Sequence, residues 1–310
     1  MNDKQKTEIK TAIVTGAFSY QGKYIAKMLL KKGYKVKTMT GHPDNKSDLS
    51  DKIEVIPYRF ERPHLIAHDL EGADLFVNTY WVRFEKGAST HGRAVANTQN
   101  LVRACKEAGV RRFVHISISN PSLDSPLTYF AGKAALEETI GASGISYAII
   151  RPTVLFGIED ILINNIAWML RRFPVFGVFG KGDYRIQPVF VGDVAPLVAD
   201  LGGSDDNTVV DAVGPETFAY ADMVRLIRDA VGVKRPIVPV PPLAGWAFGR
   251  MMGVLLRDVP LTRKEIKGLM DGLLVADTSP SCPTSFSKWV TEHGEGLGRS
   301  YSSEMSRHYR

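Results

Sequence analysis

Tyr129 and Lys133 are the residues whose types and spacing point most directly to chemistry. They lie four positions apart in a helix predicted over residues 129–140, so their side chains share one face. A tyrosine near its reference pKa of about 10 exchanges protons poorly at neutral pH. A nearby ammonium stabilises the phenolate and lowers that pKa. The pair follows a predicted strand that ends at Ser117–Ser119, and with a serine hydroxyl from there holding a substrate oxygen, the trio suits interconversion of a carbonyl and an alcohol beside a nicotinamide.

A Tyr-x-x-x-Lys pair occurs by chance on many helices, so its weight depends on what precedes it. From Thr11 to Lys32 the sequence predicts a strand, a tight turn at Gly16–Gly22 and a helix. Such a turn directs backbone N–H groups and the positive end of a helix toward a pyrophosphate. A dinucleotide fingerprint normally carries three glycines, and here Ser19 replaces the middle one. The alternative is a turn that binds nothing.

The elements around these motifs alternate between strands and helices. In the first half we predict strands at 34–40, 53–57, 74–78, 112–117 and 145–150, with helices at 88–107 and 129–140. This order predicts an α/β fold with a doubly wound, Rossmann-like parallel sheet. The second half is less regular and predicts a smaller, mixed α/β subdomain on the substrate side. We therefore divide the chain into a dinucleotide-binding region, 1–155, and a substrate-side region, 156–310, interleaved with the same core.

The residues after the second predicted strand bear on the choice of cofactor. An acidic residue there would bind the ribose hydroxyls of NAD, whereas a basic one favours the extra phosphate of NADP. The chain has Gly41 and His42, and no carboxylate, at this place, and Lys46 follows a few residues later. NADP is weakly favoured over NAD, with His42 and Lys46 as candidate phosphate partners.

The bulk composition excludes several classes of function. The 310 residues carry a formal charge of +6, but the basic residues are scattered and form no nucleic-acid reader motif, so we expect no nucleic-acid partner. Cys105 and Cys282 lack metal-ligand spacing, which favours a reduced, cytoplasmic setting without a metal site. No signal peptide or transmembrane segment is expected. We expect the apolar stretch Leu243–Leu256 to be a buried helix, with an interfacial or partner-facing helix as the alternative.

Taken in order, these motifs resemble the extended and atypical short-chain dehydrogenases/reductases. The resemblance covers almost the whole chain. The matching residues are Thr15–Ala17 with Gly22, Asn97, Ser119, Tyr129 with Lys133, and Arg151–Gly157. Three further segments resemble the NmrA-like and complex I accessory-subunit branch, namely Asn78–Phe84, Gln187–Val194 and Leu261–Ile266.

The resemblance implies roles for individual residues. Ser119, Tyr129 and Lys133 would be catalytic, with Ser119 rather than Ser117 as the family's serine, and Lys133 would also reach the nicotinamide ribose. Tyr20 and Gln21 would offer backbone N–H groups to the pyrophosphate. The cofactor-binding residues implied are Gly16, Phe18, Ser19, Tyr20, Gln21, Gly22, Gly41, His42, Asn78, Thr79, Tyr80, Asn97, Lys133, Pro152 and Val154.

Two functions follow as hypotheses. The first is an NAD(P)-dependent oxidoreductase, or an epimerase/dehydratase relative, acting on a small carbonyl, alcohol or nucleotide-sugar-like substrate. The second is a non-catalytic dinucleotide-binding regulator or accessory subunit, because some members of this branch bind a dinucleotide without known turnover. A homodimer or a protein partner would fit either. Candidates for the substrate pocket are Trp81, Arg83, Phe84, Phe156, Arg185, Gln187 and Trp246, each of which could equally be packing residues.

Overall fold

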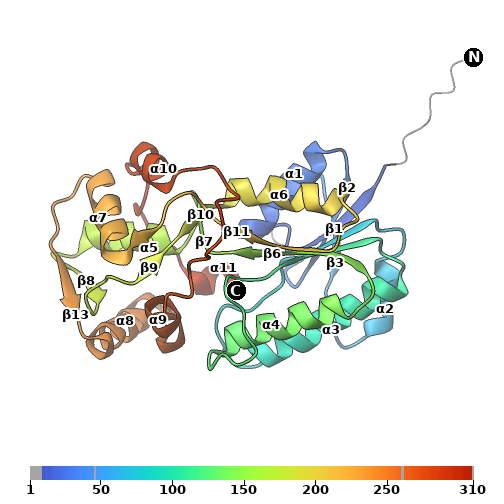
Figure 1. Ribbon diagram of the computed structural model, residues 1–310, viewed down its shortest axis with the longest axis horizontal. Coiled ribbons are helices and arrows are strands. Elements are labelled where there is room, and N and C mark those ends of the chain that lie inside the picture. Colours follow the sequence, from blue (N-terminus) through green and yellow to red (C-terminus); the bar gives the residue numbers. More distant parts are fainter. Residues whose placement is uncertain (1–8, 45–46, 260–261, 309–310) are drawn as a thin grey trace, which may run out of the picture. The chain divides into compact units, whose positions relative to one another are not determined.

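The computed structural model describes residues 9–44, 47–259 and 262–308 (Figure 1). Its contacts divide the chain into two compact units. The first comprises the described parts of Met1–Ser117, Pro121–Ile150 and Ala195–Val210, and the second those of Ile118–Asn120, Arg151–Val194 and Asp211–Arg310. The predicted roles of regions 1–155 and 156–310 stay predictions.

The described residues of the first unit are built on a seven-stranded sheet in the order β11-β6-β5-β4-β1-β2-β3. Neighbours from β3 through to β6 pair in parallel. The order reverses between β1 and β4, and in open α/β sheets a ligand crevice forms at such a switch point, beyond the carboxyl ends of the strands. The strands are β1 Thr11–Thr15, β2 Lys35–Thr40, β3 Glu54–Pro57, β4 Leu75–Asn78, β5 Arg112–Ile116, β6 Ser146–Pro152 and β11 Thr208–Ala212.

Helices cover both faces of this sheet, with α1 and α6 on one side and α2, α3 and α4 on the other (Figure 1). An ion pair between Lys32 and Asp200 links the end of α1 to α6. Because both faces are covered, the central strands β1, β4 and β5 are almost wholly buried: Phe76 of β4 is fully buried and Ile13 of β1 is 1% exposed. The predicted doubly wound α/β fold is confirmed. The helices are α1 Tyr20–Lys31, α2 Pro63–Asp69, α3 His91–Glu107, α4 Thr128–Gly141 and α6 Val191–Gly203.

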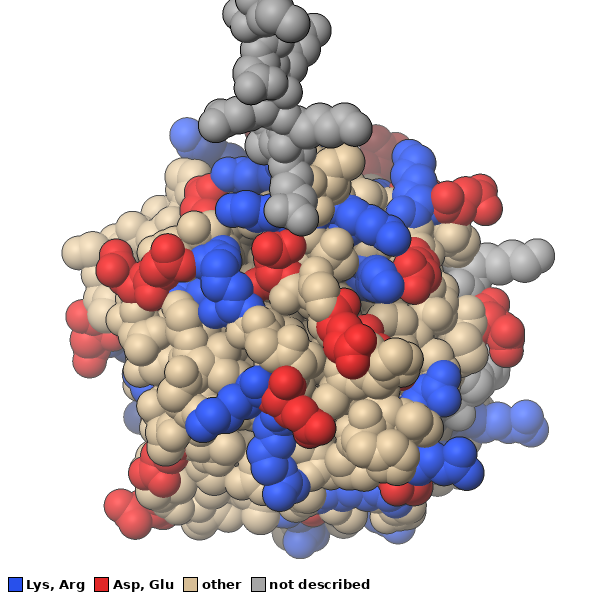
Figure 2. Space-filling model, turned by 90° about the vertical axis from the view of Figure 1, so that its right-hand side faces the viewer, with Lys and Arg blue, Asp and Glu red and all other residues tan. Residues whose placement is uncertain are grey.

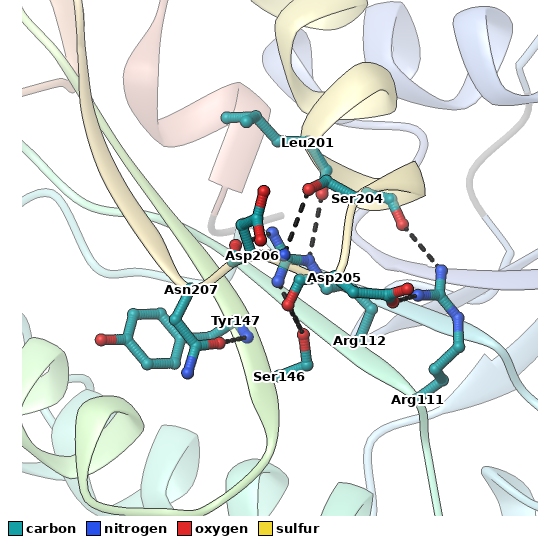
Figure 3. Close-up of polar contacts among 10 residues, drawn as sticks. Arg111, Arg112, Ser146, Tyr147, Leu201, Ser204, Asp205, Asp206 and Asn207 are labelled. Carbon is teal, nitrogen blue, oxygen red and sulfur yellow. Dashed lines mark hydrogen bonds and ion pairs between the residues drawn. The ribbon is translucent and has the colours of Figure 1, made fainter.

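Arg112 joins the end of α6 to the sheet (Figure 3). Its guanidinium is fully buried and donates to the carbonyls of Leu201 (3.0 Å) and Asp206 (2.9 Å) and to the hydroxyl of Ser146 (2.7 Å). A buried guanidinium needs such acceptors, because an unpaired buried charge is strongly destabilising. Arg112 therefore connects β5 with β6 and with the segment that leads into β11.

We expect Arg112→Met to lower the free energy of unfolding by about 3 kcal/mol, because three buried acceptors lose a charged donor. Denaturant unfolding of the purified variant measures this change. The neighbouring Arg111 is the control, since it pairs with Asp205 at the surface and Arg111→Met should change stability by no more than about 1 kcal/mol. Equal losses in the two variants would contradict the structural role given to Arg112.

Charges of both signs lie side by side on the face of the molecule drawn in Figure 2. Neither sign forms a continuous stripe on that face. Among the charges of the first unit, Lys37 on β2 forms an ion pair with Glu54 on β3 at 3.0 Å. Such exposed pairs contribute little to stability, so this surface is a solvated one.

In the described part of the second unit, short strands pair two by two: β10 with β7, β12 with β9, and β13 with β8. Its core includes Phe156, Ile166, Met223, Phe286 and Val290. The strands are β7 Val154–Phe156, β8 Phe176–Phe179, β9 Arg185–Ile186, β10 Pro188–Phe190, β12 Phe218–Ala219 and β13 Ile237–Val240; the helices are α5 Leu162–Arg172, α7 Tyr220–Ala230, α8 Pro242–Leu256, α9 Arg263–Met270, α10 Phe286–His293 and α11 Glu304–His308.

Helix α8 departs from expectation. Its apolar composition predicted a buried helix, but Leu243, Met251, Val254 and Leu255 are 61–79% exposed, and the prediction was wrong. Only Met252 and Gly253 of this helix are buried. Composition states how apolar a helix is, whereas its burial depends on which neighbours cover it. Across the described ranges, no helix combines the length and apolar character needed to cross a bilayer.

Candidate functional site

The turn after β1 depends on two glycines. Gly16 has a φ of +65°, in the left-handed region that glycine adopts without strain. Gly22 lies in the first turn of α1, and a Cβ there would stand 2.0 Å from the carbonyl oxygen of Gly16. Two glycines thus allow α1 to begin directly against β1, as a dinucleotide turn requires.

Ser19, in place of the expected middle glycine, is the N-cap of α1. Its backbone (φ −79°, ψ 170°) is extended and suits any residue. Its hydroxyl accepts the N–H of Gly22 at 3.4 Å, the usual role of a serine at this position. The substitution therefore introduces no strain. The first-turn N–H groups of α1 point beyond its amino-terminal end, where they favour an anion.

A polar network ties the turn to β4 at the switch point of the sheet. The hydroxyl of Thr15 accepts the N–H groups of Thr79 (2.7 Å) and Tyr80 (3.0 Å), and the Thr79 hydroxyl donates to the Thr15 carbonyl (2.5 Å). Asn78 is fully buried, and its Oδ1 also accepts the Tyr80 N–H at 3.2 Å. Asn97 donates to the Tyr80 hydroxyl at 2.9 Å. The structure thus brings together four residues predicted to line the cofactor.

An aromatic cluster that sequence reasoning missed lies beside this network. Tyr58 directly follows β3, and its ring stacks on Phe60 with centroids 4.7 Å apart, while Tyr80 meets each ring at 5.3 Å. Burial raises the pKa of Tyr58 well above its ordinary value, so its hydroxyl stays protonated. The sequence signal for this cluster was an aromatic residue, Tyr58, at the carboxyl end of a predicted strand. The faces of such aromatic rings suit stacking of a planar heterocycle.

The residues after β2 lie beside this cluster. Gly41 is exposed, and a Cβ there would be 3.5 Å from the ring of Tyr58. The backbone N–H of His42 donates to the Thr40 hydroxyl at 3.1 Å. Gly41 therefore has room for a larger side chain. The predicted phosphate partner Lys46, like Leu261 of the family motif, lies outside the described residues.

Lys133 is held at the carboxyl end of β5. It is 2% exposed, and its Nζ donates to the carbonyl of Ile116 at 2.7 Å. Burial lowers the pKa of Lys133 to about 7, although the carboxylate of Glu137 opposes the shift. The Nζ also lies 4.4 Å from the centre of the Trp81 ring, a cation–π contact. Near neutral pH, Lys133 thus changes its charge within a nearly dry environment.

Tyr129 shares this environment. Trp81 and His91 stack in parallel with centroids 5.8 Å apart, and Tyr129 meets them edge-on at 5.4 and 5.6 Å. Gly132 makes the arrangement possible, because a Cβ there would stand 2.9 Å from Trp81. The Trp81–His91–Gly132 arrangement was not predicted as a unit. Its sequence signal was a glycine inside a helical pattern, which often marks close packing.

Ser119 belongs to the second unit, together with Pro152 and Val154. Its hydroxyl is fully buried and donates to the carbonyl of Leu273 at 2.8 Å, and its N–H donates to Pro152 at 3.0 Å. The hydroxyl of Ser117, in the first unit, donates to Glu137 at 2.5 Å. Within this structure the Ser119 hydroxyl is hydrogen-bonded to a backbone carbonyl, and its catalytic role stays a prediction.

Two of the candidates for the substrate pocket are packing residues of the second unit. Phe156 is fully buried, with Phe286 and Trp289 around it. Gln187 is 5% exposed, donates to the carbonyl of Gly214 at 2.9 Å and accepts the N–H of Ala276 at 3.2 Å. Their side chains are satisfied within the core, which explains both residues without a substrate.

The buried ammonium of Lys133 predicts a pH dependence of stability. Its folded pKa, about 7, lies below the ordinary 10.5, so the unfolded chain binds more protons between these values. The free energy of unfolding should therefore rise with pH from 7 to 9, and Lys133→Met should flatten that rise. Denaturant unfolding at both pH values measures it. An unchanged slope in the variant would contradict the burial of Lys133.

Comparisons with known proteins show what the chain is similar to. Residues 16–160 match the family described as NAD(P)H-binding. The chain is 26% identical over 260 residues to the mitochondrial NADH dehydrogenase (ubiquinone) 1 alpha subcomplex subunit 9 of Arabidopsis thaliana, covering 80% of this chain and 65% of that one. It is 26% identical over 249 residues to the mitochondrial NADH-ubiquinone oxidoreductase 40 kDa subunit of Neurospora crassa, covering 76% and 65%. The chain thus spans 65% of the length of each of these relatives.

A solved structure shares the fold. The triphenylmethane reductase of Citrobacter sp., complexed with NADP(H), superimposes with a TM-score of 0.73 at 14% identity, covering 92% of this chain and 99% of that one. The predicted resemblance to the short-chain dehydrogenase/reductase branch that contains complex I accessory subunits is confirmed. The chain carries an NAD(P)-binding domain.

Proposed function

We propose that the chain is an NAD(P)-dependent oxidoreductase, because its residues 16–160 match the family described as NAD(P)H-binding. Its substrate would be a small carbonyl, an alcohol or a nucleotide-sugar-like compound. One observation carries this proposal: Tyr129 and Lys133 lie on one face of α4, with Lys133 bonded to the end of β5. Carboxyl ends of the parallel strands share one edge, so the pair shares that edge with the turn at Gly16–Gly22.

The nicotinamide, when bound, supplies or accepts the hydride. The residues of this chain hold the dinucleotide and move the proton. The start of α1 would bind the pyrophosphate, and Lys133, bonded to Ile116, would hold the nicotinamide ribose. Tyr129 exchanges a proton with the substrate oxygen, and the positive charge of Lys133 favours its phenolate. Trp81 and His91 contact the ring of Tyr129 and would limit its movement during this proton transfer.

We propose NADP rather than NAD as the preferred cofactor. No carboxylate follows β2 at Gly41 or His42, and the Citrobacter reductase was solved with NADP(H). Gly41→Asp should weaken NADPH binding at least about tenfold and strengthen NADH binding, because a carboxylate repels the 2′-phosphate and binds the free ribose hydroxyls. Titration with both cofactors measures the change. Gly203→Asp, also at an open glycine, is the control, and equal effects of the two substitutions would contradict the assignment.

A second candidate function is a dinucleotide-binding accessory subunit or regulator without turnover. Two observations favour it: both mitochondrial relatives are named as subunits, and the Ser119 hydroxyl is bonded to Leu273. In this role the partner would be another protein or a second copy of the chain. A cytoplasmic location, expected from the cysteines, stays a proposal, and the names of the relatives place those proteins in mitochondria.

Turnover of the full chain with NADPH distinguishes the two functions. The assay uses a panel of aldehydes, ketones, quinones and nucleotide sugars. Oxidation of the cofactor with at least one of them supports the oxidoreductase. Tight binding without oxidation by any acceptor, together with a stable complex with a second protein, would favour the accessory subunit instead.

A further inference from the structure

Helix α8 carries an exposed apolar stripe that the proposed function does not use. Leu243 is 65% exposed, Phe248 43%, Met251 61%, Val254 79% and Leu255 75%. With about 3.6 residues per turn, these positions, together with the exposed Ala244 and Ala247, fall on one continuous side of the helix, about 140° wide. The opposite side packs into the second unit through Met252 and Gly253. Apolar surface of this extent marks a binding face.

Arginines border one edge of this stripe. Arg250 is exposed, and its guanidinium lies 5.8 Å from the centre of the Trp246 ring. Arg257, also exposed, ends the helix as its C-cap residue. Residues 242–257 contain no acidic side chain. On the adjoining helix α9, the guanidinium of Arg263 lies 3.8 Å from the centre of the Trp246 ring. The edge of the stripe thus combines an indole with three cationic side chains.

A cavity of about 340 Å³ lies between α8 and α9, next to this edge. Its walls include Leu243, Trp246, Ile266 and Met270, with the charged residues Arg263, Lys267 and Asp271 among them. Lys267 pairs with Asp271 at 2.8 Å, so the cavity combines apolar walls with one ion pair and the guanidinium of Arg263. This is the chemistry of a lipid, whose acyl part is apolar and whose phosphate is anionic.

We propose that the α8 stripe binds the surface of a membrane that contains anionic lipids. The helix would lie in the plane of the interface, with its apolar stripe in the boundary between headgroups and acyl chains and its arginines on lipid phosphates. Its 15 residues extend about 22 Å, too short for a span. Trp246 is of the type enriched at this depth.

The charge of the stripe favours a membrane over a second copy of this chain. In an antiparallel pair of α8 helices, the two-fold axis would bring both arginine edges to the same side of the interface. Arg250 and Arg257 of one copy would then face those of the other, and like charges repel. An anionic membrane surface has the opposite sign and provides many phosphate partners.

Sedimentation of the full chain with lipid vesicles tests the proposal. We expect binding to vesicles of phosphatidylcholine with phosphatidylglycerol, and binding at least about tenfold weaker to phosphatidylcholine alone or at about 1 M salt. Val254→Glu with Leu255→Glu should abolish binding. The matched control is Ile158→Glu with Val175→Glu, which adds the same charge at residues 52% and 47% exposed, and it should bind like the parent. Circular dichroism confirms folding of both.

The arginines provide a second readout. Arg250→Gln with Arg257→Gln should weaken binding to the anionic vesicles by roughly twentyfold, since each basic residue contributes about fivefold. Equal binding to both vesicle types, or parent-like binding by the Val254/Leu255 variant, would overturn the proposal. The proposal would also be overturned if the parent formed a dimer and bound no vesicles, and if Val254→Glu with Leu255→Glu abolished that dimer. The assay contains no dinucleotide, so its failure would leave the proposed oxidoreductase activity untouched.

Discussion

Tyr129→Phe is expected to abolish turnover while leaving the dinucleotide in place. The substitution removes the hydroxyl that exchanges a proton with the substrate and keeps the ring that contacts Trp81 and His91. Loss of a positioned general acid lowers turnover by about 10²–10⁴-fold. Binding of NADPH should stay within about twofold of the parent, because the phenol does not carry the cofactor. Steady-state kinetics and a binding titration measure the two effects separately.

Tyr147→Phe is the matched control for this experiment. Tyr147 lies on β6 in the same unit and packs against its core, away from the proposed proton transfer. Its variant should retain turnover within about twofold of the parent. If Tyr129→Phe also retained full turnover, Tyr129 would not be the proton donor, and the catalytic part of the proposal would fail.

Gly22→Ala should destroy dinucleotide binding. The added methyl would stand 2.0 Å from the Gly16 carbonyl oxygen, and both atoms are fixed by backbone. Helix α1 must move away from β1, which displaces the N–H groups that would hold the pyrophosphate. We expect at least about hundredfold weaker NADPH binding and a loss of about 2 kcal/mol of stability. Titration and denaturant unfolding measure these changes.

Gly92→Ala is the control for the glycine experiment. Gly92 also lies in the first turn of a helix, α3, but a Cβ there meets nothing within 4 Å. Alanine at such an exposed helical position should raise stability by about 0.5–1 kcal/mol and leave NADPH binding unchanged. Parent-like NADPH binding by Gly22→Ala would show that the dinucleotide does not bind at this turn.

Local patterns were sufficient to predict the strands of the first half, but not that β11, from the second half, joins their sheet. The central strands are buried on both faces, so runs such as Ala12–Val14 and Leu75–Val77 stand out between polar turns. Helix α2 was missed because its seven residues hold only two buried positions, Ile66 and Ala67, too few for a periodic signal. The capping box formed by Thr262 and Glu265 is a feature of the opposite kind, since it involves neighbours on one helix and has a local sequence signature.

Contacts between distant residues could not be predicted in the same way. The four-residue spacing of Tyr129 and Lys133 is a local feature and was visible in the sequence. The contact of Trp81 with Gly132 joins residues about fifty positions apart, and it requires the register of β4 and α4 in the folded unit. The hydrogen bond from Ser119 to Leu273 spans 154 positions, and no sequence pattern near either residue predicts it. Such features follow from packing, which the sequence specifies only through the whole fold.

The most direct test of the central claim follows the hydride itself. The full chain, loaded with NADPH deuterated on the nicotinamide ring, is mixed with the acceptor panel in a single turnover, and the products are examined by mass spectrometry. The proposed oxidoreductase predicts that one acceptor gains the deuterium at its former carbonyl carbon, and that Tyr129→Phe slows this transfer by about 10²-fold or more. Recovery of unreacted, tightly bound NADPH with every acceptor would contradict the claim.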